Sequence, residues 1–257
     1  MNTSRVLPAV CFQNLKKFIR HPSLLLSILG GEVALSKQHV MIELRAAEYI
    51  YEQCMKGINE MHLTDTHNIV TEIYSHFSRR SCYHNSFLYG VARWFRPRIV
   101  IEAGVHYGAS TAFLLSALKL NGVGHLWSVD MPNQTYSYVG RHGECRTHSD
   151  LLPAGCDPGF VVPHTIRDRW TLVLGDVRDA LPRLIAKLPA VDLFFHDSAN
   201  TYEIMRFEYE IVWPLLASGG ILLSDDIDWN GAFQDFCTSR SLRYSLINSR
   251  KGLCTNM

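Results

Sequence analysis

A segment rich in glycine and small polar residues is the first motif in the chain that could bind a ligand. It is EAGVHYGAST, residues 102–111, and it follows the apolar run RIVI. Glycines let the backbone approach a ligand closely, and a following helix offers unpaired N–H groups in its first turn. The spacing is G-x-x-x-G, whereas dinucleotide enzymes use G-x-G-x-x-G to hold a pyrophosphate. The motif therefore favours a ligand without phosphates, although a glycine turn after a strand also has a purely structural explanation.

Acidic residues end the next two apolar runs. Asp130 ends HLWSVD, where a carboxylate can accept hydrogen bonds from both ribose hydroxyls of a nucleoside. Asp176 ends WTLVLGD, where an acidic turn can meet an adenine amino group. Each Asp alone is equally well explained as a helix N-cap. Three such turns in order at consecutive strand ends favour a shared ligand, because these sheets bind ligands at the carboxyl ends of their strands.

Three further carboxylates follow the last two apolar runs. Asp197 ends AVDLFFHD, and Asp225 and Asp226 end GGILLSDD. Neighbouring strands would bring the three to one rim, and such hard oxygen ligands suit Mg²⁺ or another divalent cation, which could lower the pKa of a bound hydroxyl. The alternative is that Asp226 caps a turn and Asp225 is solvated.

The elements that must position these residues alternate between strand and helix patterns. A parallel α/β sheet covered on both faces follows from that alternation. The chain ends in RYSLIN and LCTNM, two predicted strands joined as a hairpin. The predicted strands are 98–104, 125–130, 170–176, 190–197 and 219–226, and the predicted helices are 109–122, 177–188, 201–216 and 232–240.

Two regions lie outside this alternation. Residues 1–95 are predicted to form a helical accessory segment, with one helix over 40–57 and a second region from 67 to 94 that is interrupted at the polar run RRSCYHNS. Residues 131–169 have little periodicity, and a loop of that length inside a compact domain is usually functional or disordered. We expect two parts, the helical segment and a second domain over residues 96–257 that contains the site. Within that domain, the insertion is expected to form a lid over the site.

Composition narrows the substrates and the compartment. The net charge is +1 over 257 residues, so the chain lacks the basic character of a nucleic-acid enzyme. Its strongest apolar run, 24–29, is too short to span a bilayer, and the N-terminus does not resemble a secretory signal. Seven cysteines without a CxxC motif indicate reduced thiols. We expect a cytoplasmic protein that acts on a small molecule, without nucleic-acid or membrane partners; a homodimer stays open.

Taken in order, EAGVHYGAST, SVD, LGDVRDALP, DLFFHDSANTYE and WPLLASGGILLSDDIDWN resemble the class I S-adenosylmethionine (SAM)-dependent methyltransferases. The resemblance is closest to the methyltransferase 24 family, related to macrocin-type O-methyltransferases, and spans roughly residues 98–236. It implies a Rossmann-like seven-stranded sheet, with five parallel strands and a terminal antiparallel hairpin. It also implies methyl transfer from SAM to an oxygen of a small molecule, such as a natural-product or sugar hydroxyl.

The candidate site residues combine the motifs with this resemblance. The predicted metal ligands are Asp197, Asp225 and Asp226, and the candidate catalytic residues are Asp197, His196 and Asn200. The predicted cofactor-binding residues are Glu102, Gly104, Val105, Gly108, Ser110, Asp130, Met131, Gly175, Asp176, Val177 and Asp197.

The general base is left open by the sequence. Relatives commonly have a histidine three positions after the aspartate of H-D-S, but this chain has Asn200 there, and an amide cannot take a proton at neutral pH. His196 should point away from Asp197 on an alternating strand. The base is then Asp197, a metal-bound hydroxide or a histidine of the insertion. The alternatives to O-methylation are N-methylation, an NAD(P)-dependent oxidoreductase and a nucleoside-binding protein without activity.

Overall fold

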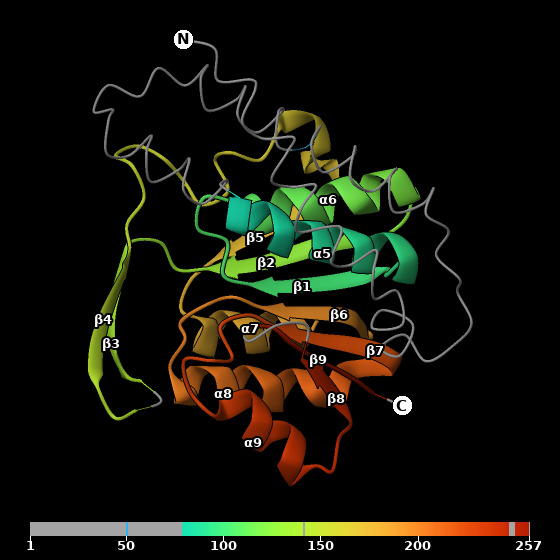
Figure 1. Ribbon diagram of the computed structural model, residues 1–257. Helices are drawn as coiled ribbons and strands as arrows, with labels where there is room; N and C mark the ends of the chain where they lie inside the picture. The colour runs from blue at the N-terminus through green and yellow to red at the C-terminus, as the bar shows by residue number, and fades with distance from the viewer. Residues whose placement is uncertain (1–49, 51–78, 141, 247–249, 257) are drawn as a thin grey trace.

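The computed structural model describes residues 50, 79–140, 142–246 and 250–256 (Figure 1). Seven strands form one sheet in the order β5-β2-β1-β6-β7-β9-β8. The first five are parallel, and β9 pairs antiparallel with both β7 and β8. The predicted methyltransferase-type sheet is therefore confirmed. Its strands are β1 (Ile99–Ala103), β2 (His125–Asp130), β5 (Trp170–Leu174), β6 (Val191–His196), β7 (Leu216–Ser224), β8 (Tyr244–Leu246) and β9 (Gly252–Thr255).

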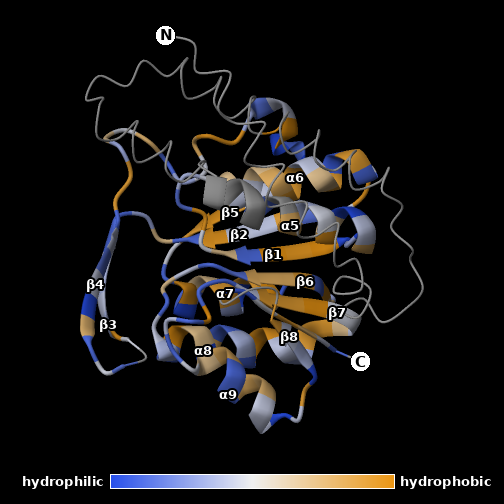
Figure 2. Ribbon diagram, viewed as in Figure 1, coloured by the Kyte–Doolittle hydropathy of each residue, from blue (hydrophilic) through white to orange (hydrophobic). Residues whose placement is uncertain are grey.

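Helices cover both faces of this sheet. On one face, α5 and α6 pack with Val100 and Phe195, and on the other, α7, α8 and α9 pack with Ile101 and Phe194. Successive residues of β1 and β6 thus point to opposite faces, as the pleat requires. Because both faces are buried, the central strands are almost continuously hydrophobic (Figure 2). The helices are α5 (Arg79–Phe95), α6 (Ala109–Asn121), α7 (Val177–Ile185), α8 (Tyr202–Val212) and α9 (Ala232–Ser239), with 3-10 turns η2 (His164–Arg169) and η3 (Trp213–Leu215).

Helix α5 corrects one prediction. The run RRSCYHNS was expected to interrupt the helix, but α5 is continuous from Arg79 to Phe95. The run contains neither glycine nor proline, and its polar residues cost only tenths of a kcal/mol each in a helix. Residues Phe87, Leu88 and Val91 of α5 then join the core beneath α6. The predicted helix 40–57 lies outside the described residues apart from Ile50, and the boundary at 95/96 stays a prediction.

The insertion contains a hairpin that the sequence did not predict. Strands β3 (Gln134–Val139) and β4 (Cys145–Asp150) pair antiparallel and stand apart from the main sheet (Figure 1). One face carries hydroxyl pairs, with Thr135 3.0 Å from Ser149 and Ser137 3.1 Å from Thr147. Because that face is polar and the other mixes Tyr with His, the usual alternation of apolar and polar residues is hidden.

No helix in the described part of the chain is both long and apolar enough to cross a membrane.

Candidate functional site

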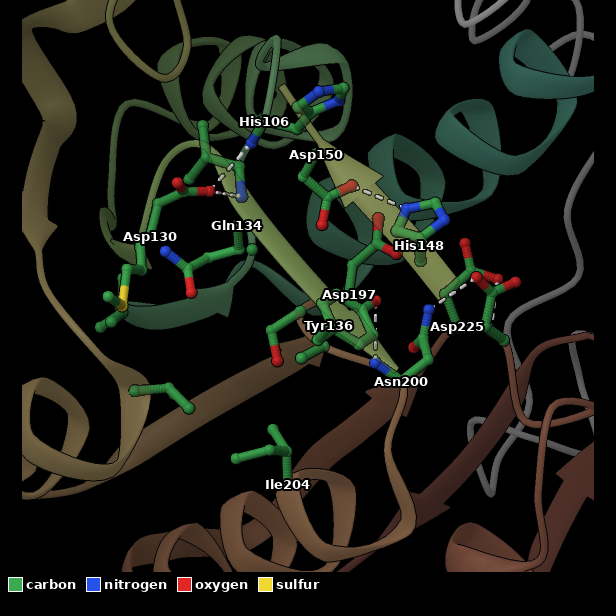
Figure 3. A pocket seen from close by; sticks show the side chains of 18 of the residues that line it. His106, Asp130, Gln134, Tyr136, His148, Asp150, Asp197, Asn200, Ile204 and Asp225 are labelled. Carbon is green, nitrogen blue, oxygen red and sulfur yellow. Dashed lines mark hydrogen bonds and ion pairs between the residues drawn. The ribbon is translucent and has the colours of Figure 1, made fainter. Parts of the chain in front are cut away.

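A cavity of about 860 Å³ lies at the carboxyl ends of the parallel strands (Figure 3). Its volume is within the ordinary range for small-molecule sites. Most of the predicted site residues line it, and so do residues of the β3–β4 hairpin. The predicted residues in the lining are Gly104, Val105, Ser110, Asp130, Met131, Gly175, Asp176, Val177, Asp197, Asn200, Asp225 and Asp226.

Asp130 holds the glycine loop at one end of the cavity. Its Oδ2 accepts hydrogen bonds from the backbone N–H groups of Val105, at 2.7 Å, and His106, at 3.0 Å. Burial raises the pKa of the Asp130 carboxyl, while these two hydrogen bonds lower it. One oxygen thus organises the loop, and the carboxylate still faces the cavity, where a ribose could bind.

The two glycines of the first motif allow loops to approach each other. Gly104 has φ 90°, and a Cβ there would lie 2.0 Å from the carbonyl oxygen of Asp197. Gly108 has φ 95°, and a Cβ there would lie 2.6 Å from Cα of Gly159. Both positions are therefore restricted to glycine by backbone conformation and space. Gly104 lines the cavity and Gly108 does not, so the structural explanation suffices for Gly108.

Glu102 lies behind the cavity and not in its lining. The side chain is fully buried, and its two oxygens accept hydrogen bonds from the hydroxyls of Ser110, Thr111 and Ser128 at 2.7–2.8 Å. Burial raises the pKa of Glu102 to about 7 despite these hydrogen bonds. A direct contact between Glu102 and the cofactor stays a prediction, and the hydrogen bonds give the residue a role in fixing Ser110, which does face the cavity.

Asp176 is the N-cap of α7, as the structural alternative anticipated. Its Oδ1 accepts from the backbone N–H of Arg178 at 2.9 Å, and Oδ2 pairs with the Arg178 guanidinium at 2.6 Å. The side-chain hydrogen bond to Arg178 holds the pKa of Asp176 below its usual value. The residue also lines the cavity together with Gly175 and Val177, so the adenine contact stays a prediction.

The three carboxylates predicted as metal ligands meet at the opposite end of the cavity, as Figure 3 shows for Asp197 and Asp225. Asp225 Oδ2 pairs with Nζ of Lys251 at 2.5 Å, and Asp226 pairs with the guanidinium of Arg250. The described residues contain no group of three His, Cys, Asp or Glu side chains arranged to hold a metal ion. The carboxylates thus come together as predicted, but in this arrangement they do not fit a divalent cation.

Asp197 has a strongly shifted pKa. Burial and the neighbouring charge of Asp225 raise it to about 8, while Lys251 and His196 counteract the shift. A partly buried carboxyl with a pKa near neutrality, in a cavity, is a common feature of functional sites.

His196 points away from the cavity, as an alternating strand predicts. Its ring is fully buried, and Nδ1 lies 2.6 Å from Glu208 Oε2. Ser198 donates to the other oxygen of Glu208 at 2.5 Å. Because His196 is absent from the cavity lining, this geometry gives it no contact with a substrate there.

Asn200 connects the hairpin to the acidic residues. Its Nδ2 donates to Asp226 Oδ2 at 2.9 Å, and its backbone N–H lies 3.3 Å from the hydroxyl of Tyr136 on β3. Tyr138, also on β3, stacks on Trp229 with 4.7 Å between ring centroids. The hairpin therefore packs over this end of the cavity.

His148 on β4 is a histidine of the insertion, the group in which the sequence left a candidate base without choosing among its members. It lines the cavity, and its Nε2 lies 2.7 Å from Asp150 Oδ1 (Figure 3). The hydrogen bond to Asp150 raises the pKa of His148. A neutral ring that donates from Nε2 to Asp150 keeps Nδ1 as a proton acceptor. In the sequence, Tyr136 and Tyr138 alternate with small hydroxyl residues, which is compatible with a strand. A hairpin predicted from this alternation would have placed His148 opposite Tyr136.

Comparisons with known proteins agree with this fold. Residues 101–227 match a family described as a methyltransferase domain. The calicheamicin methyltransferase CalS11 has 16% identity and a TM-score of 0.55, over 87% of this chain and 94% of its own. An O-methyltransferase from Bacillus cereus in complex with SAH has 13% identity and a TM-score of 0.54, over 80% and 90%. TomG, an O-methyltransferase from Streptomyces achromogenes in complex with SAM, has 16% identity and a TM-score of 0.54, over 94% and 96%. No curated protein matches the chain significantly.

Proposed function

We propose that the chain is a class I SAM-dependent methyltransferase and that it methylates a hydroxyl oxygen of a small molecule, because residues 101–227 match a methyltransferase domain. The observation that carries the proposal is the position of Asp130 and His148 at two ends of one cavity, with Asp197 between the hairpin and the sheet (Figure 3). The first end suits a nucleoside, and the second holds titratable and aromatic side chains suited to an acceptor. Three similar structures are methyltransferases, and two of these are described as O-methyltransferases.

The cofactor end fits SAM by its donors and acceptors. Asp130 would accept from the ribose, the turn at Gly175 and Asp176 would border the adenine, and the loop at Gly104 and Val105 would adjoin the amino-acid end. Bound SAM supplies an electrophilic methyl group on a positively charged sulfur. The protein's contribution is to align the acceptor and to remove its proton.

His148 is the proposed general base. It faces the cavity on the hairpin, and Asp150 fixes its ring and the tautomer that accepts a proton at Nδ1. The carboxylate of Asp197 is the second candidate, because its raised pKa of about 8 also places its proton exchange near neutrality. We derive no step through a divalent metal, since the neighbouring acids are paired with Arg250 and Lys251.

Composition supports a small acceptor and a reducing compartment. The net charge of +1 lacks the strongly basic balance that is typical of nucleic-acid enzymes. Cys145, Cys156, Cys237 and Cys254 are free thiols. A cytoplasmic small-molecule enzyme, either monomeric or a homodimer, accords with both observations.

Calorimetry tests the cofactor assignment directly. SAM and S-adenosylhomocysteine (SAH) are expected to bind with a stoichiometry of one, and NAD⁺ is expected not to bind. Binding of NAD⁺ in place of SAH would refute the proposal in favour of an oxidoreductase. Labelled SAM, supplied with sets of phenols, sugars and amines, would then identify the acceptor; transfer to amines alone would contradict the assignment to oxygen.

A further inference from the structure

Each carboxylate oxygen of Asp225 and Asp226, at the acceptor end of the cavity, already has a partner from the chain itself. Asp225 Oδ1 accepts from the backbone N–H of Asp226 at 2.9 Å, and Oδ2 accepts from Lys251. Asp226 Oδ1 pairs with Arg250, and Oδ2 accepts from Asn200. All four oxygens that could bind a metal from these two carboxylates are therefore engaged.

Lys251 and Arg250 reach these acids because of the register of β9. Ser224 pairs with Gly252 in the antiparallel β7–β9 ladder. The next residue of each strand beyond this pair is Asp225 on one side and Lys251 on the other. The backbone N–H of Ile227 donates to the carbonyl of Arg250 at 2.9 Å, which continues the association past the strand ends. The two charge pairs thus follow from strand pairing and do not depend on flexible surface side chains.

Burial makes these pairs strong constraints. Lys251 is 1% exposed, and its Nζ lies 5.3 Å from the centroid of the Phe195 ring. The Asp226 side chain is 10% exposed, and its backbone adopts φ 50°, a left-handed conformation that is uncommon outside glycine. Arg250 lies in the cavity lining, and Asp228 is a more distant acid 3.9 Å from its Nε. A buried ammonium persists only with a close counter-charge, so Lys251 and Asp225 depend on each other.

We propose that Lys251 and Arg250 form a built-in cation pair that occupies the place of a divalent metal beside Asp197, so that the protein works without one. The two side chains together carry the charge of one divalent ion, and they hold Asp225 and Asp226 in fixed orientations. They are positioning residues, since they act through the two carboxylates. This inference rests on the proposed function for its meaning in catalysis, but the metal-binding behaviour that it predicts does not.

Metal titration of the wild-type protein is the first test. Calorimetry and thermal unfolding with MgCl₂, MnCl₂ and CaCl₂ are expected to show no stoichiometric binding and no rise in Tm. SAH affinity and turnover are expected to be the same before and after dialysis against a chelator. A single metal bound below about 1 mM and lost in Asp225→Asn would overturn the proposal, as would turnover that is abolished by chelation and restored by Mg²⁺.

The double variant Lys251→Ala/Arg250→Ala tests the replacement directly. Without metal its Tm should fall by about 10 °C, because Asp225 and Asp226 each lose a cationic partner. With CaCl₂ or MgCl₂ added, the metal ion should bind Asp225 and Asp226 and restore part of the fall in Tm. The matched control Lys187→Ala/Arg183→Ala removes two exposed cations on or beside α7 and should show neither effect. A folded double variant without any metal response would overturn the proposal.

The two tests remain interpretable if the double variant fails to fold or if the proposed function fails. The wild-type titration needs no variant, and it decides the question alone when Lys251→Ala/Arg250→Ala is insoluble. Absence of SAH binding in the wild type would refute the proposed function, while the metal titration, which uses only the metal salt as a probe, would still report on the cation pair.

Discussion

Asp130 holds the glycine loop and is predicted to bind the ribose, and two substitutions of this residue together test the second role. Asp130→Ala removes both the acceptor of the Val105 and His106 N–H groups and the carboxylate that lines the cavity. Hydrogen bonds to a charged group contribute about 1.5–3 kcal/mol each. Two lost ribose contacts correspond to roughly a hundredfold at the lower bound, and water entering the cavity offsets part of this. We therefore expect SAH affinity to fall at least about tenfold.

Asp130→Asn should give an intermediate loss, because its amide oxygen can still accept from the loop while the charge facing the ribose is gone. The matched control is Asp192→Ala. Asp192 Oδ2 also accepts two backbone N–H groups, from Arg98 at 2.7 Å and Ile99 at 2.8 Å, but it does not line the cavity. Calorimetry with SAH and thermal unfolding, run on all three variants, separate affinity from stability. Unchanged affinity in Asp130→Ala, or an equal loss in Asp192→Ala, would refute the ribose assignment.

Three further predictions concern the base, the lid and a buried acid. His148→Gln should lower turnover by about 10²–10⁴-fold with little change in SAH affinity. The wild-type rate should rise as pH increases through the raised pKa of His148, and the variant should lose this rise. An unaltered pH profile in the variant would shift the role of base to Asp197. Limited proteolysis should cut residues 131–169 more slowly with SAH bound, and equal rates would contradict a lid. Burial raises the pKa of Glu102 in the folded state to about 7, above its ordinary value of 4.5, so folding favours the protonated form. The contribution of Glu102 to the free energy of unfolding is fully present below pH 4.5 and is lost as pH rises through 7. This loss is about 3 kcal/mol at most. Glu102→Gln should flatten that dependence in urea unfolding, and a slope equal to that of wild type would argue against the shift.

The sheet was predictable because its signals are local. Runs such as HLWSVD and DLFFHD end in an acid at the carboxyl end of a buried strand, and strands alternating with helices allow few arrangements. The order of these turns then brought Asp130, Asp176 and Asp197 to one cavity. The sequence left two roles open for Asp176, a ligand contact and a helix cap, and the structure shows the cap in a residue that also lines the cavity.

The residues that the sequence did not predict depend on pairing between distant segments. Arg250 and Lys251 lie between RYSLIN and LCTNM, the two strands predicted as a hairpin, and nothing local indicates that they would lie beside Asp225 and Asp226. That outcome depends on the register of β9 against β7, which places Gly252 opposite Ser224. A shift of one residue would turn each side chain of β9 to the other face of the sheet. The space at Gly252 also disfavours such a shift. A residue with a Cβ in that place would have this atom 2.3 Å from the Phe233 ring.

Asn200 illustrates how the structure changes the argument about activity. In the sequence, an asparagine where relatives carry histidine kept open a protein that binds a nucleoside without reacting. In the structure, its side chain donates to Asp226 and its backbone N–H lies near the Tyr136 hydroxyl, so the residue joins the acidic end of the sheet to the hairpin. A histidine at that position would have to replace the amide that holds Asp226. The hairpin thus secured places His148, with Asp150 behind it, in the same cavity as Asp197. The loss of one histidine is therefore compatible with catalysis by another, supplied from the insertion.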